Sequence, residues 1–274
     1  MHSALLMALI AAPAPAAAPA AAGFWTDLPA DQAMASARRE GTPVMIDLYA
    51  TWCGPCQKLD KDVFPDPEVR AEAKGFVAIK VDGETPIGER LLKRYHVVGY
   101  PTVLFLDPSG TEIDRIFGYQ PPKEFAQSMR DYRSGRNTVA AMRADLKKRP
   151  TDIELAFEVG RRLAIRGERA EAERLLNRVR KADADNAKGL ASKAMLTLGK
   201  YLHLRGGKRY AEALSLLTQL RKTYPASKDA RRALYPLARA LHGLERDAEA
   251  LGALQAAIDA DPKDVGAYNT FAWF

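Results

Sequence analysis

The sequence predicts two domains, an α/β domain with a central mixed sheet followed by an all-α array of helical hairpins. In the first half, apolar strand-like runs alternate with helical patterns. The only two cysteines of the 274 residues lie in Trp52-Cys53-Gly54-Pro55-Cys56, directly after one of these runs. After Arg133 the strand signals end, and an Ala-Glu-Ala pattern recurs. The length also favours about two domains.

The elements of the first domain follow from apolar runs and breaker residues. Strands are expected at 44–50, 76–82, 101–107 and, in hairpin relation, 111–117. Helices are expected at 31–39, about 56–72, 89–95 and 122–133. Because Pro65 and Pro67 cannot both lie inside one regular helix, the second helix should kink or divide. The most apolar strands, 44–50 and 101–106, should form the centre of the sheet.

The cysteine spacing predicts a redox-active dithiol. A structural zinc site would need further close ligands, and the four histidines are scattered along the chain. Covalent haem attachment would need a histidine where Gln57 stands. A purely structural disulfide is the remaining alternative. We therefore expect no metal and no cofactor other than the Cys53–Cys56 disulfide itself.

The first 22 residues have the pattern of a secretory signal peptide. A short apolar run, Ala4–Ala12, precedes Ala- and Pro-rich sequence that ends in small residues at Ala22. The positive charge before this run is limited to the α-amino group and His2, so a disordered leader is the alternative. We expect export to the periplasm and no membrane span in the mature chain, because no other stretch is long and apolar enough.

The net charge of +7 does not indicate a nucleic-acid partner. Basic residues alternate with acidic ones along helical patterns, which is typical of a solvated surface. The arginines at 161, 162, 166 and 169 are interpreted in the same way.

The active-site turn and a later proline motif resemble the thioredoxin superfamily. Tyr100-Pro101-Thr102 lies about 45 residues after the cysteine pair. Residues 43–53, Lys58 and Phe64-x-Asp66-Pro67-x-Val69 are similar to the C-terminal domain of the thiol:disulfide interchange protein DsbD and its soluble relatives. The resemblance covers residues 24–133. It departs from the DsbD type in the Gly-Pro between the cysteines, which is usual for thioredoxin proper.

Helix physics assigns different tasks to the two cysteines. Cys53 should begin a helix, whose free N–H groups and dipole favour a thiolate. Cys56, one turn later, should be more buried and act as the resolving thiol. Gly54 permits the tight turn, and Pro55 fits the first helical turn, where its missing N–H costs little.

The resemblance implies roles for three further kinds of residue. Asp47 would be the buried carboxylate that takes the Cys56 proton, since burial raises a carboxyl pKa toward neutrality; an aspartate facing solvent is the alternative. Pro101 would be the cis-proline beside the dithiol, and Tyr100 would influence the choice of substrate. Trp52 would pack at the rim, although ordinary surface packing is possible for both aromatics. A lysine is expected near Asp47, where Ala78 is the nearest aligned position and Lys80 follows two residues later.

The second domain resembles tetratricopeptide repeats, whose basic period is about 34 residues. The Ala-Glu-Ala pattern ends at Ala172, Ala213 and Ala250, at spacings of 41 and 37 residues, and the additional residues should fall in turns and loops. Gly160 and Ala238 fit the small position of the first helix of a repeat. Gly199 fits only if the turn at Gly206-Gly207 is longer than usual. Pro236 should kink or delay the third such helix.

These patterns give the following expected organisation. A thioredoxin-like domain spans 23–134, and 135–150 is a linker with a partial repeat helix. Repeats span about 153–186, 194–227 and 231–264, with a partial one at 265–274. The array should bind a peptide or protein ligand, a spacer being the alternative.

The sequence therefore predicts an exported thiol:disulfide oxidoreductase, a reductase or electron relay. Its partners would be protein thiol or disulfide substrates and a redox donor protein, with the repeats recruiting a protein. An interaction scaffold in which the dithiol has a minor role is the alternative, and disulfide formation or isomerisation is a third.

Overall fold

The computed structural model describes residues 23–205, 207–263 and 268. The predicted signal peptide, and the partial repeat at 265–274 apart from residue 268, lie outside the described residues. Within the described part, no helix is long and apolar enough to cross a membrane.

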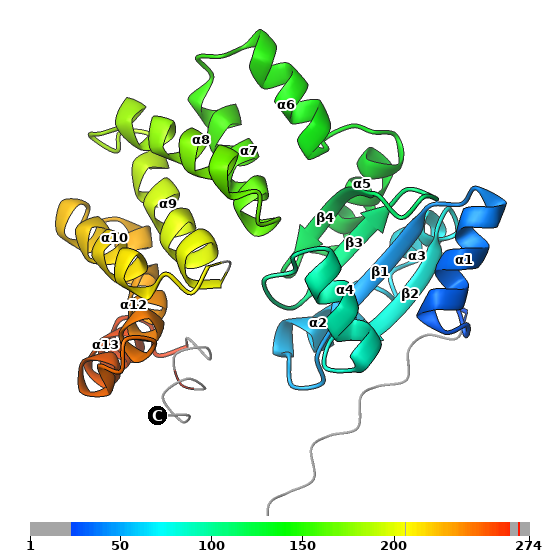
Figure 1. The fold of residues 1–274 in the computed structure, drawn as a ribbon, viewed down its shortest axis with the longest axis horizontal. Coiled ribbons are helices and arrows are strands. Elements are labelled where there is room, and N and C mark those ends of the chain that lie inside the picture. Colours follow the sequence, from blue (N-terminus) through cyan, green and yellow to red (C-terminus); the bar gives the residue numbers. More distant parts are fainter. Residues whose placement is uncertain (1–22, 206, 264–267, 269–274) are drawn as a thin grey trace, which may run out of the picture.

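A four-stranded mixed sheet forms the centre of the first domain (Figure 1). Its strands are β1 (Val44–Tyr49), β2 (Val77–Asp82), β3 (Thr102–Leu106) and β4 (Glu112–Phe117), in the order β2-β1-β3-β4. β1 runs parallel to β2 and antiparallel to β3, and β3 and β4 form an antiparallel hairpin. The predicted central pair of strands is confirmed.

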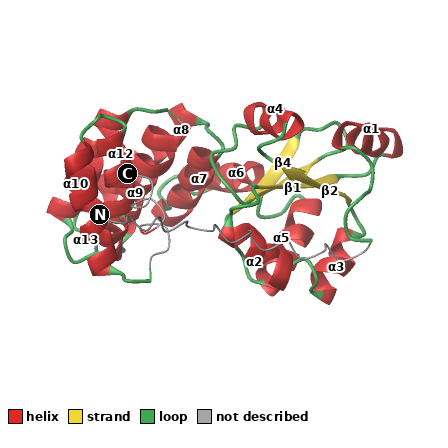
Figure 2. Cartoon of the chain, turned by 90° about the horizontal axis from the view of Figure 1, so that it is seen from below, coloured by secondary structure: helices red, strands yellow, loops and turns green. Residues whose placement is uncertain are grey.

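Helices cover both faces of the sheet, as Figure 2 shows. One face carries α1 (Ala30–Glu40) and α4 (Pro86–Arg94); the other carries α2 (Gly54–Asp62), α3 (Pro67–Ala73) and α5 (Pro122–Arg133). Side chains of β1 alternate between the two layers, because successive residues of a strand point to opposite faces. Ile46 and Leu48 pack with the first set of helices, and Met45 packs with the second.

The division of the predicted 56–72 helix is confirmed. α2 ends at Asp62, and α3 begins at Pro67. A proline is tolerated at the first position of a helix, because the N–H group that it lacks would make no bond within the helix there. Asp66 caps α3 by accepting the backbone N–H groups of Glu68 and Val69.

The second domain is an arch of antiparallel helices (Figure 1). Its elements are α6 (Val139–Lys148), α7 (Ile153–Ile165), α8 (Arg169–Ala182), α9 (Leu190–Thr197), a π-helical segment (Leu198–Arg205), α10 (Tyr210–Thr223), α11 (Lys228–Arg232), α12 (Leu234–His242) and α13 (Asp247–Ala260). Leucines and alanines fill two successive cores along the array. Each helical pair buries its apolar face by stacking on its neighbour.

Two predictions for the repeats are tested by their helices. Part of the additional length lies inside a helix, because α9 continues as the π-helical segment; its placement only in turns and loops was wrong. Gly199 lies in this segment and makes a tight contact: an added Cβ would lie 2.7 Å from Leu217 Cδ2. The predicted interruption of the helix near Pro236 is confirmed. α11 ends at Arg232, four residues before Pro236, because proline has no N–H to donate to the Arg232 carbonyl.

The edge strand β4 joins the two domains through buried charges. Asp114 accepts the backbone N–H of Val139 at 2.7 Å and lies 3.2 Å from Arg162 Nη1. Arg166 Nη1 lies 3.6 Å from the other Asp114 oxygen. Burial raises the pKa of Asp114, and Arg162 opposes this rise. The interpretation of Arg162 and Arg166 as a solvated surface was therefore wrong, because both guanidinium groups pair with the acidic strand.

Candidate active site

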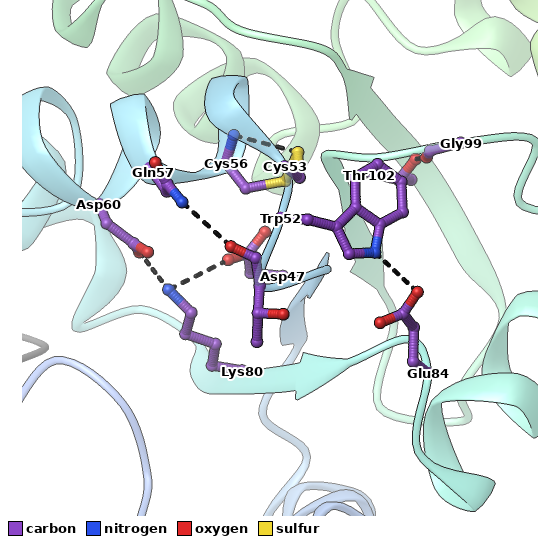
Figure 3. Close-up of a disulfide and its surroundings, with 11 residues drawn as sticks. Asp47, Trp52, Cys53, Cys56, Gln57, Asp60, Lys80, Glu84, Gly99 and Thr102 are labelled. Carbon is purple, nitrogen blue, oxygen red and sulfur yellow. Dashed lines mark hydrogen bonds and ion pairs between the residues drawn. A yellow bond between two sulfur atoms is a disulfide. The ribbon is translucent and has the colours of Figure 1, made fainter. Parts of the chain in front are cut away.

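The two cysteines form a disulfide at the N-terminus of α2 (Figure 3). Cys53 is the N-cap, and its Sγ accepts the backbone N–H of Cys56 at 3.2 Å. Gly54 is the first helical residue, and Pro55 follows in the first turn. Both cysteines are almost fully buried, with exposures of 4% for Cys53 and 2% for Cys56, so burial separates them less than expected. The free N–H groups and the helix dipole at this point favour negative charge on Cys53.

Asp47 is a buried carboxylate on β1, only 1% exposed. Its Oδ1 has no hydrogen-bond partner among the described residues. Its Oδ2 lies 3.7 Å from Lys80 Nζ, because the parallel register of β1 and β2 pairs the two residues. Burial raises the pKa of Asp47 to about 7; Lys80 opposes the rise, and the negative charge of Asp60 adds to it. In Figure 3, Asp47 lies between the disulfide and Lys80.

Lys80 and Asp60 complete this charged group, and sequence reasoning missed Asp60 and left the lysine open. Lys80 Nζ also pairs with the Asp60 carboxylate of α2. The ammonium lies over the ring of Tyr49 at 4.7 Å from its centroid. The aligned position Ala78 is one strand repeat away, packed in the apolar core. Two signals in the sequence could have indicated these residues. Asp60 follows Cys56 by four residues, which places both on one face of the helix, and residues 78 and 80 lie on the same face of their strand.

The proline motif lies at the start of β3. The Tyr100–Pro101 peptide bond is cis. Gly118 donates its backbone N–H to the Pro101 carbonyl at 2.9 Å, and the Thr102 hydroxyl donates to the Gly99 carbonyl at 2.7 Å. The ring of Tyr100 packs with the two cysteines and Ala50. The loop is thus held from both sides at the edge of the site.

Trp52 forms the exposed rim of the site. Its side chain is 68% exposed, and Nε1 donates to Glu84 Oε1 at 2.7 Å. Its ring meets that of Tyr100 edge to face, with centroids 5.9 Å apart. A large apolar surface held in place by a hydrogen bond is suited to contact with another polypeptide. Glu84 is a further residue that sequence reasoning missed, since it lies 32 positions from Trp52.

The structure brings the sequence-predicted site residues to one place. Trp52 and Tyr100 lie beside the disulfide that Cys53 and Cys56 form, and Asp47 lies beneath it. The arrangement can exchange disulfides, because it combines a sulfur at a helix N-terminus, a second sulfur in reach and a carboxylate that titrates near neutrality. Over the described residues, no cluster of three or more His, Cys, Asp or Glu side chains could hold a metal ion.

Comparison with known proteins gives matches in both domains of the chain. Residues 30–133 match the family of the thioredoxin-like domain, and residues 204–272 match a tetratricopeptide repeat family. DsbD of Klebsiella pneumoniae is 39% identical over 108 residues, which cover 38% of this chain and 18% of that protein. DsbD 1 of Pseudomonas aeruginosa is 38% identical over 100 residues, 34% of this chain and 17% of that protein.

One solved structure to which the chain is similar is a domain of a DsbD protein. The reduced C-terminal domain of DsbD from Neisseria meningitidis is 28% identical, covers 39% of this chain and 93% of that chain, and has a TM-score of 0.33. The chain spans less than a fifth of the length of the curated relatives described above. Residues 30–133 are thus a thioredoxin-like domain, joined in one chain to tetratricopeptide repeats, and their similarity to thiol:disulfide interchange proteins supports a thiol:disulfide oxidoreductase.

Proposed function

We propose that this chain reduces the disulfides of exported proteins, or relays electrons to them, through Cys53 and Cys56. The single observation that supports this most is the position of the Cys53 sulfur at the N-terminus of α2, 3.2 Å from the Cys56 backbone nitrogen. In the reduced protein the same N–H group would stabilise a Cys53 thiolate, the species that attacks disulfides.

The reaction takes two exchanges and transfers two electrons. The Cys53 thiolate attacks one sulfur of the client disulfide, so a mixed disulfide forms and the other client sulfur leaves as a thiolate. Cys56 then gives up its proton and attacks the Cys53 sulfur, which releases the second client thiolate. The Cys53–Cys56 disulfide formed in this step is the state described above. A redox donor protein reduces it again by the same kind of exchange.

Asp47 is proposed as the base that takes the Cys56 proton. A general base is most effective when its pKa lies near the working pH, and the pKa of Asp47 is about 7. Lys80 and Asp60 connect Asp47 to the surface, because each of them keeps part of its side chain exposed. The proton could thus leave the buried site through this charged group.

The repeats are proposed to hold a protein partner close to the rim of the dithiol site. Tyr201 of the π-helical segment meets the ring of Phe117 edge to face, with centroids 5.6 Å apart. Phe117 immediately precedes Gly118, which donates to the Pro101 carbonyl. The second repeat therefore contacts the residue next to the one that holds the cis-proline loop. The bonds of Asp114 with Val139 and Arg162 connect the two domains and keep the repeats in this position.

Redox titration combined with an insulin-reduction assay tests the proposed direction. A reductase should reduce insulin and have a midpoint potential near that of thioredoxin, about −270 mV. A midpoint near about −120 mV, as found for strong oxidants, would overturn the reductase assignment. Replacing Cys53 by serine in the native setting tests the scaffold alternative, because unchanged function would assign the activity to the repeats.

A further inference from the structure

A cavity of about 390 Å³ lies between α6 and α8, away from the dithiol. Arg143 and Lys147 line it from α6, and Arg174 and Arg178 line it from α8. The volume lies in the range of about 300–1,000 Å³ that is usual for small-molecule sites. The redox chemistry above uses none of these residues.

The spacing of the basic residues that line this cavity does not stabilise the helices that carry them. On each helix the two basic residues are four positions apart, and like charges at this spacing destabilise a helix. Glu171 is the acidic residue of the lining and pairs with Arg143 at 2.6 Å. Glu168 pairs with the same arginine at 2.5 Å. Glu171 also lies 3.9 Å from Arg174.

Two cations remain without compensation. For Lys147 and Arg178, no acidic partner occurs among the residues that the structure describes. The charge around the cavity is thus positive even after its ion pairs are formed, because the four lining cations are opposed by two carboxylates, Glu171 of the lining and Glu168 beside Arg143.

Arg178 presents an unused binding edge. Its Nε and Nη2 atoms are buried, and neither has a hydrogen-bond partner within the described part of the chain. In the planar guanidinium the N–H bonds of these two atoms point the same way, and this edge binds both oxygens of a carboxylate or phosphate. Arg143 Nε is buried and unpaired in the same way. Buried donors without acceptors are rare, and a bound ion is one of the ordinary reasons for them.

We propose that this cavity binds the oxyanion group, a carboxylate or phosphate, of a small molecule. The Arg178 edge would take two of its oxygens, and Arg143 Nε and Lys147 would compensate its charge. The buried side chains of Leu146 and Leu175 would receive an apolar part of the ligand. The bound anion would hold α6 to α8. It would thereby restrain α6, whose first residue, Val139, donates its N–H to Asp114 at the contact between the two domains.

The test is a titration of the full chain, ¹⁵N-labelled at arginine, with sodium phosphate and separately with sodium acetate. Sodium chloride keeps the ionic strength constant, and the Nε–Hε signals of Arg178 and Arg143 are followed. A saturable shift of these two signals with either probe supports the site. Saturation by phosphate alone identifies a phosphate site, and saturation by both identifies a general oxyanion site. Shifts that are absent, or that do not saturate, would overturn the proposal.

A variant pair separates the cavity from general surface charge. In Arg178→Gln, the response of Arg143 Nε should be at least about tenfold weaker, because two charge-assisted hydrogen bonds are lost. Arg180→Gln removes the same charge from the same helix but does not line the cavity, and should respond as the natural sequence does. An equal loss in both variants would contradict a defined site. The measurement on the unmodified chain decides the question if the first variant fails to fold.

Discussion

Asp47 and Lys80 are paired across the parallel strands β1 and β2, with 3.7 Å between Oδ2 and Nζ. The pair is incomplete, because Asp47 Oδ1 has no hydrogen-bond partner among the described residues and Lys80 is shared with Asp60. The lysine therefore does not offset the desolvation of Asp47, whose pKa remains raised to about 7. The site keeps a carboxyl group that can accept a proton at neutral pH.

Replacing Asp47 by asparagine should stabilise the oxidised protein at alkaline pH. The folded protein holds the Asp47 proton up to about pH 7 and the unfolded chain releases it near pH 3.8, so the natural protein loses stability as pH rises between these values. Asparagine cannot titrate and therefore removes this loss, which is about 4 kcal/mol at pH 8 for pKa values of 3.8 in the unfolded chain and about 7 in the folded one. Urea unfolding at pH 4 and pH 8 measures it. A gain that is the same at both pH values would refute the buried titration.

The same substitution should slow disulfide exchange at neutral pH. Without the carboxylate, Cys56 has no buried base, and the loss should be on the order of 10²-fold. The rate of the second exchange, followed by stopped-flow with a preformed mixed disulfide, measures it directly.

Lys80→Met and Asp60→Asn should move the pKa of Asp47 in opposite directions. Lys80 lowers this pKa and Asp60 raises it, so the first substitution should raise it and the second should lower it. Carboxyl ¹³C NMR titration of Asp47 reads the change. Asp62→Asn is the matched control, because this carboxylate pairs with Lys58 at 2.5 Å and is not among the groups that act on Asp47. Shifts of the same sign in both test variants would disprove the assignment.

Cys56→Ser should trap protein clients as mixed disulfides on Cys53. The first exchange proceeds, but serine cannot attack the Cys53 sulfur, so the covalent complex persists. Purification under non-reducing conditions and mass spectrometry identify the partners. Cys53→Ser is the control and should retain none in this way. Equal recovery from both variants would show that Cys53 is not the attacking thiol.

Gly199→Ala should destabilise the repeat array. The added Cβ would lie 2.7 Å from Leu217 Cδ2, and overpacking of this kind costs about 1–3 kcal/mol. Gly252→Ala on α13 is the control: nothing lies within 4 Å of its added Cβ, so it should stabilise by about 0.5–1 kcal/mol. Chemical unfolding followed by circular dichroism compares them. Similar effects in the two variants would argue against the close helix packing at residue 199.

Asp114→Ala should loosen the connection between the domains. It leaves the buried N–H of Val139 without its acceptor and removes one of the partners of Arg162, which keeps its contacts with Glu158 and the Asn137 carbonyl. A buried donor left without its acceptor costs about 1–3 kcal/mol. Small-angle scattering should show a wider range of domain positions, while the midpoint potential stays unchanged. Asp145→Ala is the control, because its pair with Lys148 is exposed. A destabilisation no larger than that of the control would contradict the role of Asp114 in connecting the two domains.

The sequence was sufficient for features whose signals are local. Apolar runs, proline positions and the cysteine spacing predicted all four strands, the division between α2 and α3, and the order of the elements. The lysine beside Asp47 stayed ambiguous because strand register depends on contacts between distant segments. Asp114 and Arg162 are 48 residues apart and form no local pattern, so Arg162 was interpreted as part of a solvated surface. The π-helical segment was missed because the repeat spacing fixes the number of additional residues but not the element that contains them.

The charged joint on β4 also has a consequence for self-association. β4 is the outermost strand of the sheet beside β3, and an uncovered edge strand offers free N–H and C=O groups to another chain. Here Arg115 donates to the carbonyl of Ile165 at the end of α7, and Arg162 and Arg166 pair with the acidic residues of the strand. The first repeat is thus anchored along this edge of the sheet, and we expect that detaching it would leave the β4 side of the sheet more accessible to another chain.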